Sequence, residues 1–153
     1  MNALLLDLLP YVHRGYCCSQ LLLVLAAQAT DREDPGLLCA LRGLCHGIGQ
    51  SGGPCGLLTG GAAVLAWLVC RDADEPHPML DAMTGEYAAW FAERVGSCGG
   101  TGCEQVSSGL AADAGMSLPE GGMPPLDLCG DLLADCWGKI LDICEAYDVD
   151  IRS

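Results

Sequence analysis

The sequence has few basic residues for its length of 153. Seven Lys and Arg residues stand against twenty Asp and Glu residues, and the formal net charge is −13. Nucleic acids and anionic membrane surfaces are bound through clustered positive charge. The sequence therefore excludes both as partners, and the acidic residues are expected to form a solvated surface.

The sequence also contains little that favours β-sheet. It has a single Phe, few β-branched residues, and an apolar content of 51% in which Leu and Ala stand out. Leu and Ala favour helix, whereas strands are enriched in β-branched and aromatic residues. We therefore predict an all-α fold, a single compact bundle of five or six helices with two Gly-rich loops, in which residues 1–153 form one cysteine-rich domain.

Apolar residues recur at helical spacing, and this periodicity sets the expected boundaries. Helices are predicted over residues 3–12, 17–29, 35–45, 55–71, 78–95 and 126–147, with a short helix starting near 103. The Gly-rich loops are residues 47–54 and 96–102. Residues 107–125 are expected to form a long connection.

Long hydrophobic runs are absent as well. The most apolar stretch, residues 55–70, is too short at about 1.5 Å per residue to span a bilayer core of about 30 Å. We predict that it is the buried central helix and that no segment spans a membrane. The first seven residues lack positive charge and include Asp7, so no secretion signal is expected. A cytoplasmic protein with reduced cysteines is the simplest interpretation.

Eleven cysteines are present, but the usual short motifs are not. No C-x-x-C occurs, which argues against thioredoxin-type pairs and zinc ribbons. No C-x-x-C-H occurs, and ferredoxin spacings are also missing. The cysteines therefore need to be judged by their positions on the predicted helices.

Four cysteines fall in the first turn of predicted helices, behind Gly or Pro: Cys18, Cys55, Cys103 and Cys129. A helix N-terminus stabilises an anion and lowers the pKa of a thiol, and thiolate is the metal ligand. Nearby glycines allow close backbone approach to an inorganic cluster, and Gly49, Gly53 and Gly56 are the predicted cofactor-binding positions. The cysteines inside helices or near helix ends are interpreted as small hydrophobic residues: Cys39, Cys45, Cys70, Cys136 and Cys144.

Several segments together resemble the C-GCAxxG-C-C family of redox-active proteins. They are residues 15–20 (GYCCSQ), 47–49 (GIG) and 55–60 (CGLLTG), followed by 91–103 and the helix that begins near Cys129. Leu57 stands where the family usually has Ala. The resemblance puts the family's four cysteines on Cys18, Cys55, Cys103 and Cys129. The family is also similar to part of the split-Soret cytochromes, which are helical and carry an iron–sulfur cluster, and the missing haem motif removes the haem.

The expected function is a small redox or electron-transfer protein with one iron–sulfur cluster, [2Fe–2S] or [4Fe–4S], on these four thiolates. It is expected to serve a redox partner protein as a carrier or sensor rather than as a catalyst, and a homodimer is plausible. Three further cysteines leave the ligand assignment open: Cys17, Cys98 and Cys136. His13 and His46 keep a mixed Cys/His site open. The alternatives are a binding or storage protein for Cu(I) or Zn and a metal-free thiol–disulfide redox protein.

Overall fold

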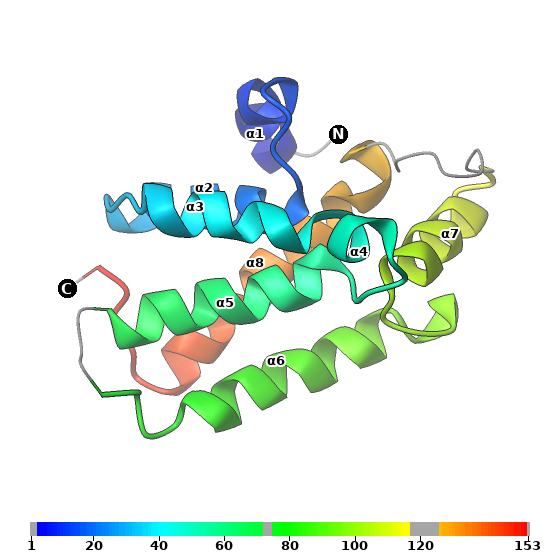
Figure 1. Cartoon of the computed structure of the whole chain (residues 1–153). Coiled ribbons are helices and arrows are strands. Elements are labelled where there is room, and N and C mark those ends of the chain that lie inside the picture. Colours follow the sequence, from blue (N-terminus) through cyan, green and yellow to red (C-terminus); the bar gives the residue numbers. More distant parts are fainter. Residues whose placement is uncertain (1–2, 72–74, 117–125, 153) are drawn as a thin grey trace.

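The computed structural model describes residues 3–71, 75–116 and 126–152 of the chain. These residues form helical segments with no strand among them (Figure 1). The segments are α1 (Ala3–His13), α2 (Cys18–Thr30), α3 (Pro35–Leu41), η1 (Arg42–Leu44), α4 (Cys45–Gln50), α5 (Gly56–Cys70), α6 (Leu80–Arg94), η2 (Gly96–Cys98), α7 (Cys103–Asp113) and α8 (Leu126–Ala146). The predicted all-α class is confirmed.

The predicted number of five or six helices was wrong. Segment α4 is a left-handed turn rather than an α-helix, because φ is positive at each residue from His46 to Gln50. Seven α-helices remain among the described residues. Each of them overlaps one of the seven segments predicted above, including the short helix near 103, so the total given for the bundle was too low although the helix positions were right.

Two predicted boundaries also need correction. The helix expected over 35–45 ends at Leu41 and continues as a 3-10 turn and then the left-handed turn. The connection expected over 107–125 begins later, because α7 remains helical to Asp113 and buries Val106 and Ala111 against the rest of the protein. Residues 117–125 of that predicted connection lie outside the described residues.

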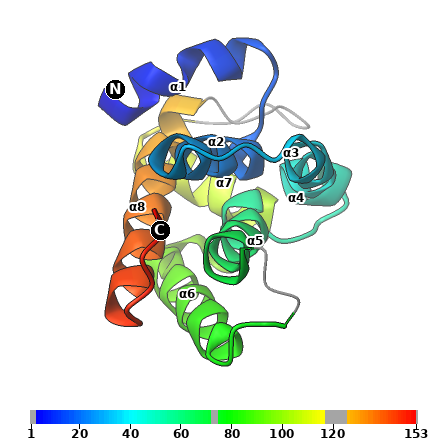
Figure 2. The ribbon, with the colours of Figure 1, turned by 90° about the vertical axis from the view of Figure 1, so that its left-hand side faces the viewer.

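Helix α5 is the central helix of the fold, as predicted. It contacts α2 on one side and α6 on the other, and it also packs against α8 (Figures 1 and 2). Apart from Thr59, its side chains are apolar around the whole helix, which is typical of a helix surrounded by others. Leu57, Val64, Leu65 and Leu68 are fully buried in the core that these contacts form.

Two glycines of α5 allow neighbouring segments to approach closely, Gly60 for α2 and Gly56 for η1. A Cβ atom placed on Gly60 would lie 2.5 Å from Cβ and 2.7 Å from Cα of Ser19 in α2. A Cβ atom placed on Gly56 would lie 3.4 Å from the carbonyl oxygen of Leu44. Small residues at this interface therefore hold the N-terminal end of α5 against the first turn of α2.

No described helix combines the length and the apolar character needed to cross a lipid bilayer.

Candidate functional site

The four predicted ligands line one cavity of about 140 Å³. Cys18 is the first residue of α2, Cys55 directly precedes α5, and Cys103 is the first residue of α7. Cys129 lies in the first turn of α8. The helix starts that the sequence indicated thus meet around a common space, and the thiols of four separate helices are brought together there.

Backbone pairing between the two Gly-rich segments joins Cys55 to Cys103. The Cys55 N–H donates to the carbonyl oxygen of Thr101 at 2.8 Å, and the Cys103 N–H donates to that of Gly53 at 3.0 Å. An isolated antiparallel bridge between Pro54 and Gly102 lies between these bonds. The segments just ahead of α5 and α7 are therefore held side by side, so that their first residues share one wall of the cavity.

The left-handed turn supports the same wall. A Cβ atom placed on Gly47 would lie 2.8 Å from Cβ of Cys103 and 2.8 Å from the carbonyl oxygen of Gly53. Gly47 therefore permits a contact that no other residue would allow. His46 and Ile48 share its positive φ, which costs about 1–2 kcal/mol for each residue other than glycine. Such strain persists only where the surrounding structure imposes it.

Three of the cavity thiols have a raised pKa. A hydrogen bond with Cys129 and burial raise the pKa of the Cys18 thiol well above its usual value. Burial raises the pKa of Cys55 to about 12 and also raises the pKa of Cys103. These thiols are therefore protonated at neutral pH, and a metal that binds them has to displace their protons.

His46 and His13, the two histidines considered for a mixed Cys/His site, differ in their surroundings. His46 lines the cavity, and its pKa is lowered by burial and by the nearby charge of Arg42. Its imidazole is consequently neutral near pH 7, the form in which a ring nitrogen can bind a metal. His13 is exposed and is not part of the cavity wall.

Cys17 and Cys45 form a disulfide, with their Cα atoms 5.8 Å apart. Both residues line the same cavity as the four thiols. The expectation that Cys45 is only a small hydrophobic residue, and that all thiols are reduced, is therefore corrected. The two residues are separated by 28 positions, and no short motif links them. Only the approach of the left-handed turn to the start of α2 brings them together.

The other two secondary ligand candidates lie outside the cavity wall. Cys98 packs against Gly109 of α7, where a Cβ atom would lie 2.5 Å from the Cys98 sulfur. Cys136 is fully buried, and burial raises its pKa to about 12 while a hydrogen bond with Tyr87 opposes that rise. The Tyr87 hydroxyl in turn donates to the carbonyl oxygen of Leu57 at 2.6 Å.

The glycines predicted to approach a cofactor have different places. Gly56 lines the cavity, whereas Gly49 and Gly53 are not among its lining residues. Gly53 contributes through its backbone, since its N–H donates to the carbonyl oxygen of Gly47 at 3.0 Å. Among the cysteines interpreted as core residues, Cys136 and Cys144 are buried and Cys70 is half-buried, but Cys39 is exposed on α3.

As the side chains stand, no group of three or more His, Cys, Asp or Glu residues in the described ranges has an arrangement ready to hold a metal ion. The four thiols are nevertheless close enough to influence one another. Cys18 is hydrogen-bonded to Cys129, and Cys55 interacts electrostatically with Cys18 and Cys103. Four soft sulfur donors around a small buried space suit a thiolate-bound metal or cluster by their chemistry.

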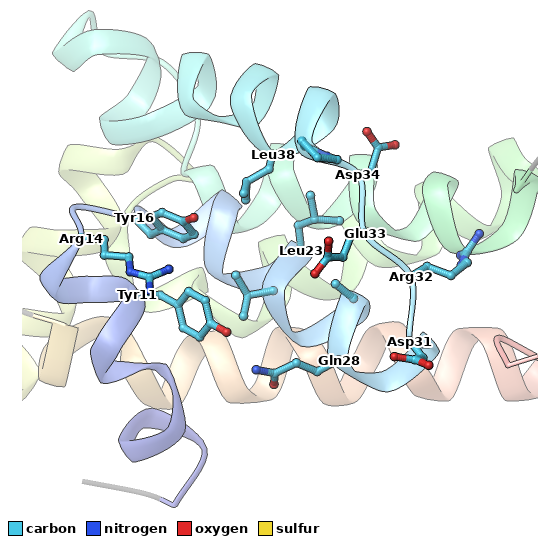
Figure 3. A pocket seen from close by; sticks show the side chains of 13 residues that line it. Tyr11, Arg14, Tyr16, Leu23, Gln28, Asp31, Arg32, Glu33, Asp34 and Leu38 are labelled. Atoms are coloured by element: carbon cyan, nitrogen blue, oxygen red, sulfur yellow. The ribbon is translucent and has the colours of Figure 1, made fainter.

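A second cavity, of about 440 Å³, lies beside α1, α2 and α3 (Figure 3). Tyr11, Arg14, Gln28 and Glu33 are among the side chains on its wall. The Arg14 guanidinium lies 5.7 Å from the centre of the Tyr11 ring. No cysteine lines this cavity, in contrast to the smaller one.

The fold and the thiol-lined cavity define a class of protein: an all-helical, cysteine-rich protein in which cysteines from separate helices line one cavity. Residues 16–143 match the family described as "Putative redox-active protein (C_GCAxxG_C_C)". The chain belongs to this family, as the sequence resemblance predicted. No curated protein and no solved structure matches the chain significantly.

Proposed function

We propose that this redox-family protein binds one iron–sulfur cluster through Cys18, Cys55, Cys103 and Cys129 and exchanges electrons with a redox partner protein. The single observation that carries the proposal is that these four cysteines, from four different helix starts, line one cavity. Their chemistry fits the cluster, because iron–sulfur clusters are held by four cysteine thiolates.

The local electrostatics support the same assignment. Each helix start directs unpaired backbone N–H groups and a partial positive charge toward its N-terminal residues. This charge stabilises thiolates after metal binding has displaced their protons. An iron–sulfur cluster supplies one-electron redox chemistry when bound. The protein contributes the four thiolates, the backbone that positions them, and a partly buried setting.

The first experiment is anaerobic purification, followed by absorption and EPR spectra and by measurement of iron and acid-labile sulfide. We expect a coloured protein with iron and sulfide in the ratio of one cluster per chain. A colourless protein that takes up no iron after reconstitution would refute the proposal. Several Cu(I) ions per chain would instead identify a metal-storage protein, and zinc without sulfide would identify a zinc site.

Cysteine variants then test the ligand set. Replacing Cys18, Cys55, Cys103 or Cys129 by Ser, one at a time, is expected to remove most of the bound iron. Cys98→Ser is the matched control, because Cys98 is half-buried like Cys18 and Cys103 but lies outside the cavity wall. Iron content unchanged in all four variants would show that other residues hold the metal.

A further inference from the structure

We propose that Cys17 and Cys45 form a second redox site, a dithiol/disulfide couple that exchanges with a dithiol reductant. The disulfide joins the residue before α2 to the left-handed turn α4. Both of its cysteines line the same cavity as the four proposed ligands, and each is 8% exposed. The bridge is thus shielded on most sides and meets the open space of the cavity on the remaining one.

A buried hydroxyl is placed to assist the exchange. The oxygen of Ser19 lies 3.2 Å from the sulfur of Cys17 and 3.9 Å from the sulfur of Cys45. In the disulfide form this hydroxyl donates to the carbonyl oxygen of Leu41 at 2.9 Å. Rotation about its C–O bond would redirect the proton to whichever sulfur is released as thiolate, since hydrogen bonds to charged groups are the stronger ones.

The start of α2 also favours Cys17 as the sulfur that is released as a thiolate. The backbone N–H of Cys17 donates to the side-chain oxygen of Gln20 at 3.2 Å, and the amide nitrogen of Gln20 donates to the carbonyl oxygen of Leu38 at 3.0 Å. Gln20 is buried, and these bonds fix Cys17 at the N-terminal end of the helix. A thiolate at this position is stabilised by the free N–H groups of the first turn.

The exchange balances without another reactant. A thiolate of the reductant attacks one sulfur of the bridge, the Cys17–Cys45 bond breaks, and the released thiolate takes up a proton. The second thiol of the reductant, as thiolate, then attacks the reductant's own sulfur in the mixed disulfide, and the second protein cysteine leaves as a thiolate that takes up a proton. In total, the bridge gains two electrons and two protons and becomes two thiols, while the dithiol becomes a disulfide.

The bridge is connected to the four-cysteine site through the backbone. Cys17 directly precedes Cys18, and Cys45 is two residues before Gly47, which abuts Cys103. Opening the bridge therefore loosens the supports of two of the four thiols. This coupling, unlike the exchange itself, rests on the proposed metal centre.

The exchange is tested by thiol trapping on metal-free protein equilibrated anaerobically in buffers of reduced and oxidised dithiothreitol. Acid quenching, alkylation of the denatured protein and mass spectrometry are expected to show nine alkylated thiols at the oxidising end and eleven at the reducing end. Fragmentation should assign the two additional thiols to Cys17 and Cys45. A bridge between other cysteines, no bridge, or a bridge that resists excess reductant in the folded protein would overturn the proposal.

Single variants confirm the assignment. Cys17→Ser and Cys45→Ser are expected to abolish the two-thiol step, whereas Cys39→Ser, on the exposed face of α3, is expected to retain it. If either variant fails to fold, the fragmentation result on the unaltered protein still decides the matter. A two-thiol step that persists in the folded Cys17→Ser protein would refute the pairing.

The coupling has its own measurement, the rate at which iron leaves reconstituted protein for a chelator. We expect a several-fold faster loss from Cys45→Ser than from Cys39→Ser. Equal rates would overturn the coupling and leave the exchange site standing. Failure of the chain to bind iron would refute the proposed function, while the thiol titration of the metal-free protein would be unaffected.

Discussion

The replacement of Gly60 by Ala tests how α2 and α5 hold the cavity. A methyl group at this position would lie 2.5 Å from Cβ and 2.7 Å from Cα of Ser19. Because one of these atoms belongs to the backbone, rotation of the serine side chain cannot relieve the clash. Inserting an atom into a well-packed interface costs about 1–3 kcal/mol, and we expect α2 to move away from α5.

The matched control is Gly85→Ala. Gly60 and Gly85 both lie inside helices of 15 residues, but Gly85 is exposed and a methyl group there meets no atom within 4 Å. Replacing glycine by alanine inside a helix stabilises it by about 0.5–1 kcal/mol. This gain is common to both variants, so the difference between them measures the cost of the clash, about 1–3 kcal/mol.

Urea unfolding followed by circular dichroism measures that difference. With a slope of about 1–3 kcal/mol per molar urea, the unfolding midpoint of Gly60→Ala should lie on the order of 1 M below that of Gly85→Ala. Since Ser19 follows Cys18 directly, Gly60→Ala should also bind less iron than Gly85→Ala. Two variants of equal stability would refute the close packing of α2 on α5.

Four further predictions concern other contacts. Tyr87→Phe removes the hydrogen bond to Leu57 and should lower the free energy of unfolding by about 1 kcal/mol, measured by urea titration. Ile48→Gly relieves a positive φ and should raise that free energy by up to about 1 kcal/mol; a loss would contradict the left-handed turn. Burial raises the pKa of Cys144 to about 11, so its contribution to stability is present below about pH 9 and falls as pH rises through 11. Cys144→Ala should therefore lose less stability than the unaltered protein between pH 8 and 11. Finally, because Cys55 is protonated near pH 7, metal binding should release protons into weakly buffered solution, and the apparent metal affinity should increase with pH.

The position of the candidate ligands at helix starts was predictable because its signals are local. A cysteine behind a glycine at the start of an apolar periodic segment is visible in the sequence, and Cys18, Cys55 and Cys103 all have this setting. Helix N-termini attract anions through their own backbone groups. The prediction that these residues act as ligands therefore needed no knowledge of which helices touch.

The disulfide and the left-handed turn were not predictable in this way. The residues Gly47-Ile48-Gly49 indicate a loop, but nothing local indicates that His46 and Ile48 adopt a positive φ. That conformation is imposed by the contact of Gly47 with Cys103, a residue that lies far along the chain from it. The exposure of Cys39 was missed for a related reason, since a short helix shows too few turns to reveal its buried face.

The sequence by itself determined the helical class, the central position of residues 55–70 and the family to which the chain belongs. These follow from side-chain composition, periodicity and a motif, all of which act over a few neighbouring residues. The tertiary structure alone decided that Cys17 meets Cys45 and that six cysteines line one cavity. Such meetings depend on how helices pack against one another, and packing is fixed by the shapes of surfaces that come from distant parts of the chain.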